Sequence, residues 1–153
     1  MGEWVVFDYG GVLCRDRSEA DRRGLAELAG VADVAGWSHP YEATLQIAAR
    51  LAEDGTKLAL LSNCPPPMAD AIDTMSWTDL IPQRFYSCRL GTIKPDPATY
   101  TAVLAEIRAR PADVTFVDDR PVNVAGARAV GMRALLFTDP AVLAADLDLQ
   151  EDQ

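Results

Sequence analysis

Polar side chains follow three short apolar runs of this sequence at the point where each run ends. Asp8 comes directly after the first run, Ser62-Asn63 after the second and Asp118-Asp119 after the third. A carboxylate can act as a nucleophile. Two carboxylates at the end of a buried strand are costly unless a cation lies beside them. These residue types predict a nucleophile and a cation site, provided that the fold brings the three segments together.

The apolar runs are typical of buried β-strands, because they are short, bounded by polar or turn residues, and rich in Val, Leu and Phe. We expect four strands and a weaker fifth, at Trp4–Phe7, Leu58–Leu61, Val114–Val117, Ala134–Phe137 and Arg84–Cys88.

Stretches with helical spacing lie between the strands. A pattern like a capping box starts at Ser18, and further helices are expected at Tyr41–Asp54, from Asp96-Pro97, at Pro121–Val130 and from Asp139-Pro140. Alternating strands and helices favour an α/β fold, a Rossmann-like three-layer sandwich around a central, mostly parallel five-stranded sheet. Ligands bind such sheets at the carboxyl ends of the strands, which is where the polar residues stand.

Composition limits the classes of function. The chain has 153 residues, enough for one domain with its own core. Its net charge of −9 argues against a nucleic-acid partner. No apolar run approaches the roughly 20 residues of a membrane span, so no membrane association is expected. The three cysteines are odd in number and unrelated in spacing, which favours a reducing compartment and a cytoplasmic location.

Four segments carry a resemblance to a known family. They are Val5–Leu13, Leu60–Asn63, Gly91–Pro97 and Phe116–Asn123. In this order and spacing they resemble the four motifs of the haloacid dehalogenase (HAD) superfamily, whose members are mostly phosphatases. The likeness covers nearly the whole chain except about residues 15–45, and it implies a hydrolase with the α/β core described above.

The resemblance implies a Mg²⁺ ion and the residues that hold it. Asp8 would be the nucleophile, forming an aspartyl-phosphate with the substrate. The metal ligands would be the Asp8 carboxylate, the Gly10 backbone carbonyl, Asp118 and Asp119. Magnesium suits this set because it prefers oxygen ligands and acts on phosphate groups.

The resemblance also assigns residues to the substrate. Ser62 and Asn63 would bind the phosphoryl group. Lys94 would neutralise charge on that group and on Asp8, so that Asp8, Ser62 and Lys94 form the catalytic set. Asn123 would support the loop that carries the acidic pair.

Position 10 departs from the superfamily's phosphatase pattern. Phosphatases of the superfamily usually have a second aspartate two residues after the nucleophile, where it acts as general acid and base, but this sequence has Gly10. Such proton transfer is typically worth about 10²–10⁴ in rate. We therefore expect a weaker phosphatase, or one helped by water or by another group such as Asp16.

The segment before the second motif is short. Only 54 positions separate Asp8 from Ser62 (62 − 8), which leaves room for a reduced cap at about residues 15–45. The substrate would be a small phosphorylated metabolite or, if the site is open, a larger phosphorylated substrate. A second copy of the chain in a homo-oligomer would cover it instead, because a missing lid leaves apolar surface exposed.

Two functions compete with a phosphatase for phosphate monoesters. Metal-independent dehalogenation uses the same carboxylate on carbon, with Arg15 or Arg17 gripping the substrate, but such a site gains nothing from the pair Asp118-Asp119. A non-catalytic binding or assembly protein is the other alternative, because loss of the acid/base residue and of most of the cap is what such decay would look like.

Overall fold

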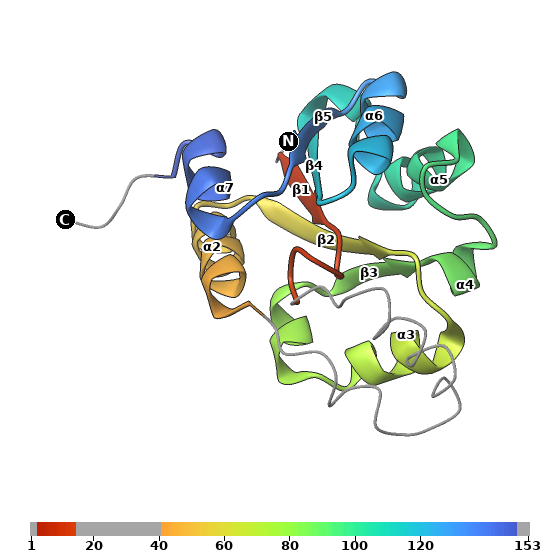
Figure 1. Ribbon diagram of the computed structural model, residues 1–153, viewed down its shortest axis with the longest axis horizontal. Coiled ribbons are helices and arrows are strands. Elements are labelled where there is room, and N and C mark those ends of the chain that lie inside the picture. The colour runs from red at the N-terminus through yellow and green to blue at the C-terminus, as the bar shows by residue number, and fades with distance from the viewer. Residues whose placement is uncertain (1–2, 15–40, 150–153) are drawn as a thin grey trace.

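Five parallel strands form the centre of the molecule, in the order β3-β2-β1-β4-β5, with helices on both faces (Figure 1). The computed structural model describes residues 3–14 and 41–149. The strands are β1 (Trp4–Phe7), β2 (Lys57–Ser62), β3 (Gln83–Tyr86), β4 (Val114–Asp118) and β5 (Arg133–Leu136). The helices are α2 (Glu42–Glu53), α3 (Pro66–Asp73), η2 (Ser76–Leu80), α4 (Ser87–Leu90), α5 (Pro97–Ile107), η3 (Pro111–Asp113), α6 (Pro121–Ala129) and α7 (Pro140–Asp146).

The strand order reverses beside the central strand β1. The chain moves from β1 to β2 and β3 on one side, and then returns to place β4 and β5 on the other. In the register, Phe7 pairs with Leu60 of β2 and with Val117 of β4. The residues that follow these three positions therefore emerge side by side at the carboxyl edge, where parallel sheets bind ligands. The expected α/β fold is confirmed, and all five strands are parallel.

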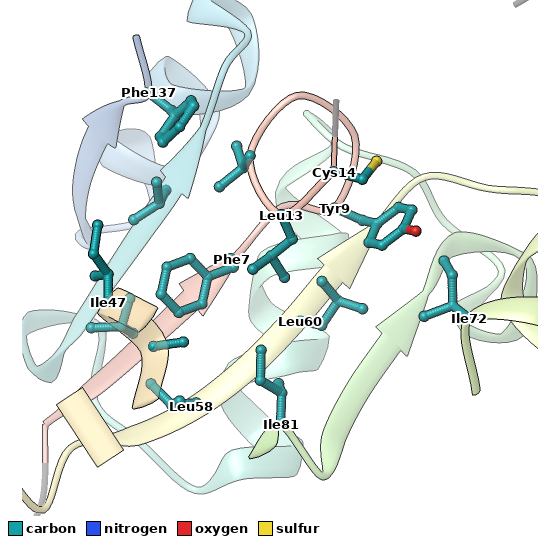
Figure 2. Packing of buried hydrophobic residues seen from close by; sticks show 14 of the residues in the cluster. Phe7, Tyr9, Leu13, Cys14, Ile47, Leu58, Leu60, Ile72, Ile81 and Phe137 are labelled. Carbon is teal, nitrogen blue, oxygen red and sulfur yellow. The ribbon is translucent and has the colours of Figure 1, made fainter. Parts of the chain in front are cut away.

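Alternating side chains of the strands supply two cores, one on each face of the sheet. On one face, Val5, Phe7 and Leu60 pack with side chains of α2, α3 and α7 (Figure 2). On the other face, Val6 and Phe116 pack with side chains of α5 and α6. The sheet is buried on both sides, which explains why its strands are near-continuous apolar runs.

Helix ends follow the signals in the sequence. The Asp96 side chain accepts a hydrogen bond from the N–H of Ala98 at the start of α5, and Asp139 does the same for Val142 in α7. Each aspartate satisfies a backbone donor that the first turn of a helix leaves unpaired. Gly131 follows α6 with φ of +96°, a conformation that favours glycine.

The segment after the second motif differs from expectation. The strand expected at Arg84–Cys88 ends at Tyr86, and α4 begins at Ser87, whose hydroxyl bonds to the backbone of Cys64. Helix α3 was not expected after Ser62-Asn63. Its first positions hold two of the three consecutive prolines, where a missing N–H costs nothing.

The short cap expected at about residues 15–45 lies mostly outside the described residues. The helix expected after Ser18, together with Arg15, Asp16 and Arg17, lies outside them as well. The last positions of the expected cap segment fall within α2, which begins at Glu42 and buries Ile47 and Leu51 in the core. No helix in the described ranges 3–14 and 41–149 is long and apolar enough to cross a membrane.

Candidate active site

Asp8 is held where β1 leaves the sheet. Its N–H donates a 2.9 Å hydrogen bond to the carbonyl of Val117, so the pairing of β1 with β4 continues one residue past the strand. The chain then turns sharply, because the carbonyl of Tyr9 accepts hydrogen bonds from the N–H groups of Val12, Leu13 and Cys14. The Asp8 residue is 7% exposed, at the edge where the sequence placed a site.

Three carboxylates meet beside this turn. Oxygen atoms of Asp8, Asp118 and Asp119 all lie within 4.8 Å of one another. Asp118 is fully buried at the end of β4. Gly11 lets Asp119 approach closely, because a Cβ atom at this position would overlap the Asp119 carboxylate. The convergence expected from the ends of the apolar runs is confirmed for these residues.

Lys94 lies between two of the carboxylates. Its Nζ donates to Asp8 Oδ1 at 2.8 Å, to Asp118 Oδ2 at 2.9 Å and to the carbonyl of Leu61 at 3.0 Å. An ammonium has three N–H donors, so all three are used. The ion pairs are buried, since the Lys94 side chain is 1% exposed. A buried lysine of this kind is costly without such partners.

Burial also changes the acidity of the nucleophile candidate. Desolvation raises the pKa of Asp8 from 3.8 to about 7. The positive charge of Lys94 lowers this pKa, while the negative charges of Asp118 and Asp119 raise it. Additional positive charge at this position would therefore favour the carboxylate form.

Further contacts fix Asp118. Its Oδ1 accepts from the backbone N–H of Arg120 at 2.9 Å, and its Oδ2 accepts from Asn123 Nδ2 at 3.2 Å. Asn123 is buried, and its carbonyl accepts from the Tyr100 hydroxyl at 2.7 Å. Asn123 thus bonds to the acidic pair that it was expected to support. Tyr100 was not singled out in the sequence, because it lies within the apolar pattern of α5.

Ser62 and Asn63 differ in their surroundings. Ser62 is the last residue of β2 and is buried, whereas Asn63 is exposed. Asn63 Nδ2 donates to the carbonyl of Lys94 at 3.1 Å, and Asn63 Oδ1 accepts from the N–H of Lys94 at 2.9 Å. The amide expected to bind substrate therefore has the main chain of Lys94 as its partner.

Space is open at Gly10, in contrast to Gly11. A Cβ atom at Gly10 would have no heavy atom within 4 Å, apart from its chain neighbours. Gly10 lies in the turn two residues after Asp8 and forms an isolated bridge with Cys14. The part played by its carbonyl as a metal ligand stays a prediction.

The donor set fits a divalent cation with a preference for oxygen. Three carboxylates and one ammonium give a formal charge of −2 (−3 + 1) when all are ionised. Hard oxygen ligands without nitrogen or sulfur suit Mg²⁺ rather than Zn²⁺ or copper. Asp8 and Asp119, together with the remaining lone pairs of Asp118, are the side chains that could hold the ion.

Comparison with known proteins assigns the chain to a family. Residues 15–131 match the haloacid dehalogenase-like hydrolase family. The chain belongs to this family. The match covers most of the sequence and spans the motifs that carry Ser62, Lys94 and Asp118.

Two curated relatives of this HAD-like protein are named as a hydrolase and a phosphatase. A flavin mononucleotide hydrolase of Arabidopsis thaliana is 30% identical in an alignment 152 residues long, which covers 94% of this chain and 60% of that protein. A sesquiterpene phosphatase of Aspergillus oryzae is 37% identical over 86 residues, which is 56% of this chain and 44% of that protein. The chain thus spans less than two thirds of the length of either relative.

Solved structures share the fold of this HAD-like protein. One is a HAD family enzyme of Bacteroides thetaiotaomicron in complex with magnesium and inorganic phosphate. The two match with a TM-score of 0.72 and 18% identity, over 90% of this chain and 95% of that one. At this identity the likeness shows the fold alone.

Proposed function

We propose that this HAD-like hydrolase is a Mg²⁺-dependent phosphatase that transfers the phosphoryl group of a monoester to Asp8 and then to water. The observation that carries the proposal is the junction of Asp8 with Asp118, Asp119 and Lys94 at one buried strand edge. Phosphoryl transfer needs a nucleophile, a site of oxygen ligands for a metal ion, and a positive charge beside the nucleophile, which the Lys94 ammonium supplies here.

The first step forms the covalent intermediate. An Asp8 oxygen attacks phosphorus, the bond between phosphorus and the ester oxygen breaks, and the leaving alcohol carries away the electron pair. Lys94 lowers the pKa of Asp8, which favours its carboxylate form, and offsets the charge that gathers beside it. Because all three Lys94 donors are already used, contact with the phosphoryl group requires Lys94 to exchange one of them. Bound Mg²⁺ would reduce the repulsion between Asp8 and the phosphoryl oxygens.

The second step restores the enzyme. Water attacks phosphorus of the aspartyl-phosphate, the bond from phosphorus to Asp8 breaks with its electron pair left on the Asp8 carboxylate, and phosphate leaves with one proton of that water while the other proton passes to solvent. Ser62, buried at the end of β2, would donate a hydrogen bond to a phosphoryl oxygen in both steps. Asn123 and the N–H of Arg120 hold Asp118 in place throughout.

The leaving alcohol receives no proton from position 10, because Gly10 has no side chain. Its oxygen must leave as an anion or take a proton from water. The enzyme therefore favours esters whose alcohols are stable as anions, such as phenols, over simple alkyl phosphates.

Two exposed apolar side chains suggest the substrate class. Ile93 precedes Lys94 and is 59% exposed, and Val122 follows the acidic pair and is 51% exposed. We propose a small phosphate monoester with an apolar or aromatic body, and both curated phosphatase relatives are named for such substrates. Ile93→Ser would raise KM for an aromatic ester. The control Val142→Ser, at a side chain that is 43% exposed on α7, would leave KM unchanged.

The cellular location of the protein is part of the same proposal. All three cysteines are free thiols, as a reducing compartment requires, and we place the protein in the cytoplasm.

Phosphate release from an aryl phosphate tests the proposal. We expect turnover with Mg²⁺, loss of turnover with a chelator, and loss of turnover in Asp8→Asn. Release of halide from a 2-haloacid without metal would support the dehalogenase alternative instead. Binding of a phosphate analogue with Mg²⁺ but no turnover over a broad panel of monoesters would support a non-catalytic protein.

A further inference from the structure

We propose that Asn63 is a positioning residue, which acts by holding the main chain of Lys94 so that the ammonium of Lys94 stays between Asp8 and Asp118. This inference rests on the proposed phosphatase function. It gives Asn63 a role different from the substrate contact expected at this position of the second motif.

The two hydrogen bonds between Asn63 and Lys94 form a closed pair. The amide N–H of Asn63 donates to the carbonyl of Lys94 at 3.1 Å, and the N–H of Lys94 donates to the amide oxygen of Asn63 at 2.9 Å. A side-chain amide that meets both backbone groups of one residue restrains its distance and its orientation together. A single hydrogen bond would leave the backbone free to rotate about it.

Lys94 needs such support because its surroundings are irregular. It lies between α4 and α5, outside any helix or strand, and its neighbours Ile93 and Pro95 are both exposed. Its own side chain is long and has many rotamers when it is not restrained. The position of Nζ therefore depends on where the Cα atom is held.

Both ends of Lys94 are tied to the same strand end. Its backbone bonds to Asn63, and its Nζ donates to the carbonyl of Leu61 at 3.0 Å. Ser62, the last residue of β2, lies between Leu61 and Asn63 in the sequence. Lys94 is therefore bonded on both sides of the serine that is expected to bind the phosphoryl group.

A kinetic comparison separates this role from substrate binding. Asn63→Ala removes both hydrogen bonds. We expect kcat to fall by about 10- to 100-fold with KM little changed, because a displaced Lys94 ammonium stabilises the transition state less. Thr101→Ala, which removes an exposed hydroxyl on α5, is the control and would leave both parameters unchanged. A rise in KM with unchanged kcat would overturn the inference in favour of direct substrate contact.

A double-mutant cycle excludes a merely structural effect. If Asn63 acts through Lys94, then Asn63→Ala adds no further loss of kcat in a Lys94→Ala background. Additive losses would overturn the inference. Asn63→Asp keeps the acceptor for the N–H of Lys94 but not the donor, and would restore part of the lost kcat.

A crystal structure of Asn63→Ala gives a readout that does not depend on activity. We expect Nζ of Lys94 to move away from Asp8 Oδ1, and an unchanged separation would overturn the inference. Wild-type protein without phosphatase turnover would overturn the proposed function, whereas turnover with equal kcat in Asn63→Ala would overturn only the role of Asn63.

Discussion

Lys94 Nζ donates a 2.8 Å hydrogen bond to Asp8 Oδ1, although the two residues lie 86 positions apart in the chain. The pair is buried at the carboxyl edge of the sheet, and Asp118 shares the same ammonium at 2.9 Å. Lys94 therefore contributes to folding in addition to its proposed role in catalysis, because it is the cation that allows two carboxylates to be buried together.

Replacing Lys94 by methionine tests this double role. Lys94→Met keeps a long, unbranched side chain but leaves the Asp8 and Asp118 carboxylates without their cationic partner. We expect a loss of about 3–5 kcal/mol in the free energy of unfolding, the usual cost of breaking a buried ion pair. Mg²⁺ would recover part of that loss, because it binds only the folded site. Urea unfolding with and without Mg²⁺ measures both effects, and a variant as stable as wild type without metal would contradict them.

Gly10→Asp tests the missing acid. The open space at position 10 accepts a side chain, and no positive φ restrains it. A carboxyl group there would protonate the leaving alcohol, so we expect turnover of alkyl phosphates to rise by up to about 10²–10⁴-fold. Aryl phosphates, whose alcohols leave readily, would gain much less. The measurement is kcat over a series of esters with leaving alcohols of increasing pKa, and an equal slope in both proteins would contradict the expectation.

At Gly11, unlike Gly10, the structure has no space for a side chain, and Gly11→Ala tests this difference. A Cβ atom there would overlap the Asp119 carboxylate, and φ of +80° is unfavourable for alanine. We expect Asp119 to be displaced and Mg²⁺ affinity to fall at least about tenfold, in proportion to the lost ligand. Calorimetric titration with Mg²⁺ measures this change, and Gly10→Ala is its matched control with affinity retained.

Acid sensitivity of the fold is expected to come partly from Asp73. Burial raises the pKa of this carboxyl group, but hydrogen bonds from Arg84, Tyr86 and Arg89 outweigh it and hold the pKa below 3.8. The unfolded chain therefore binds a proton at higher pH than the folded one. The stability from Asp73 is present above pH 3.8 and is lost as pH falls through the lower, folded pKa.

Asp73→Asn would remove this dependence. We expect the variant to be less stable than wild type at pH 7 by about 1–3 kcal/mol, the worth of hydrogen bonds to a charged group. The difference would shrink as the pH falls below 3.8. Urea midpoints measured from pH 7 down to pH 3 follow this change, and a difference that stays constant with pH would contradict it.

The cysteines are expected to differ in reactivity. Burial raises the pKa of the Cys64 thiol to about 12, whereas Cys88 is exposed at the start of α4. The thiolate is the reactive form, so iodoacetamide at pH 8 would label Cys88 first and Cys64 only slowly. Peptide mass spectrometry measures the two rates, and equal rates would contradict the burial of Cys64.

The sequence predicted where the carboxylates of the site meet because each of them lies at the end of a strand. Asp8 and Asp118 follow apolar runs that pair in parallel, so their convergence follows from the register alone. The helix starts at Asp96 and Asp139 were predictable for a similar reason, since capping is a local interaction.

Other features depend on contacts that sequence spacing does not encode. The hydrogen bonds between Asn63 and the main chain of Lys94 were not predicted, because they form only where the irregular loop that carries Lys94 returns to lie beside Asn63. The strand expected at Arg84–Cys88 ends early, because the Ser87 side chain bonds to the backbone of Cys64, a residue 23 positions away. In both cases a long-range hydrogen bond decides a local conformation.

The most direct test of the phosphatase proposal is acid-quenched mass spectrometry of the enzyme during turnover of an aryl phosphate with Mg²⁺. We predict a phosphoryl group on the peptide that contains Asp8, absent with a chelator and absent in Asp8→Asn. Full phosphate release by Asp8→Asn, with no phosphorylated Asp8 peptide in the wild type at any quench time, would contradict nucleophilic catalysis by Asp8.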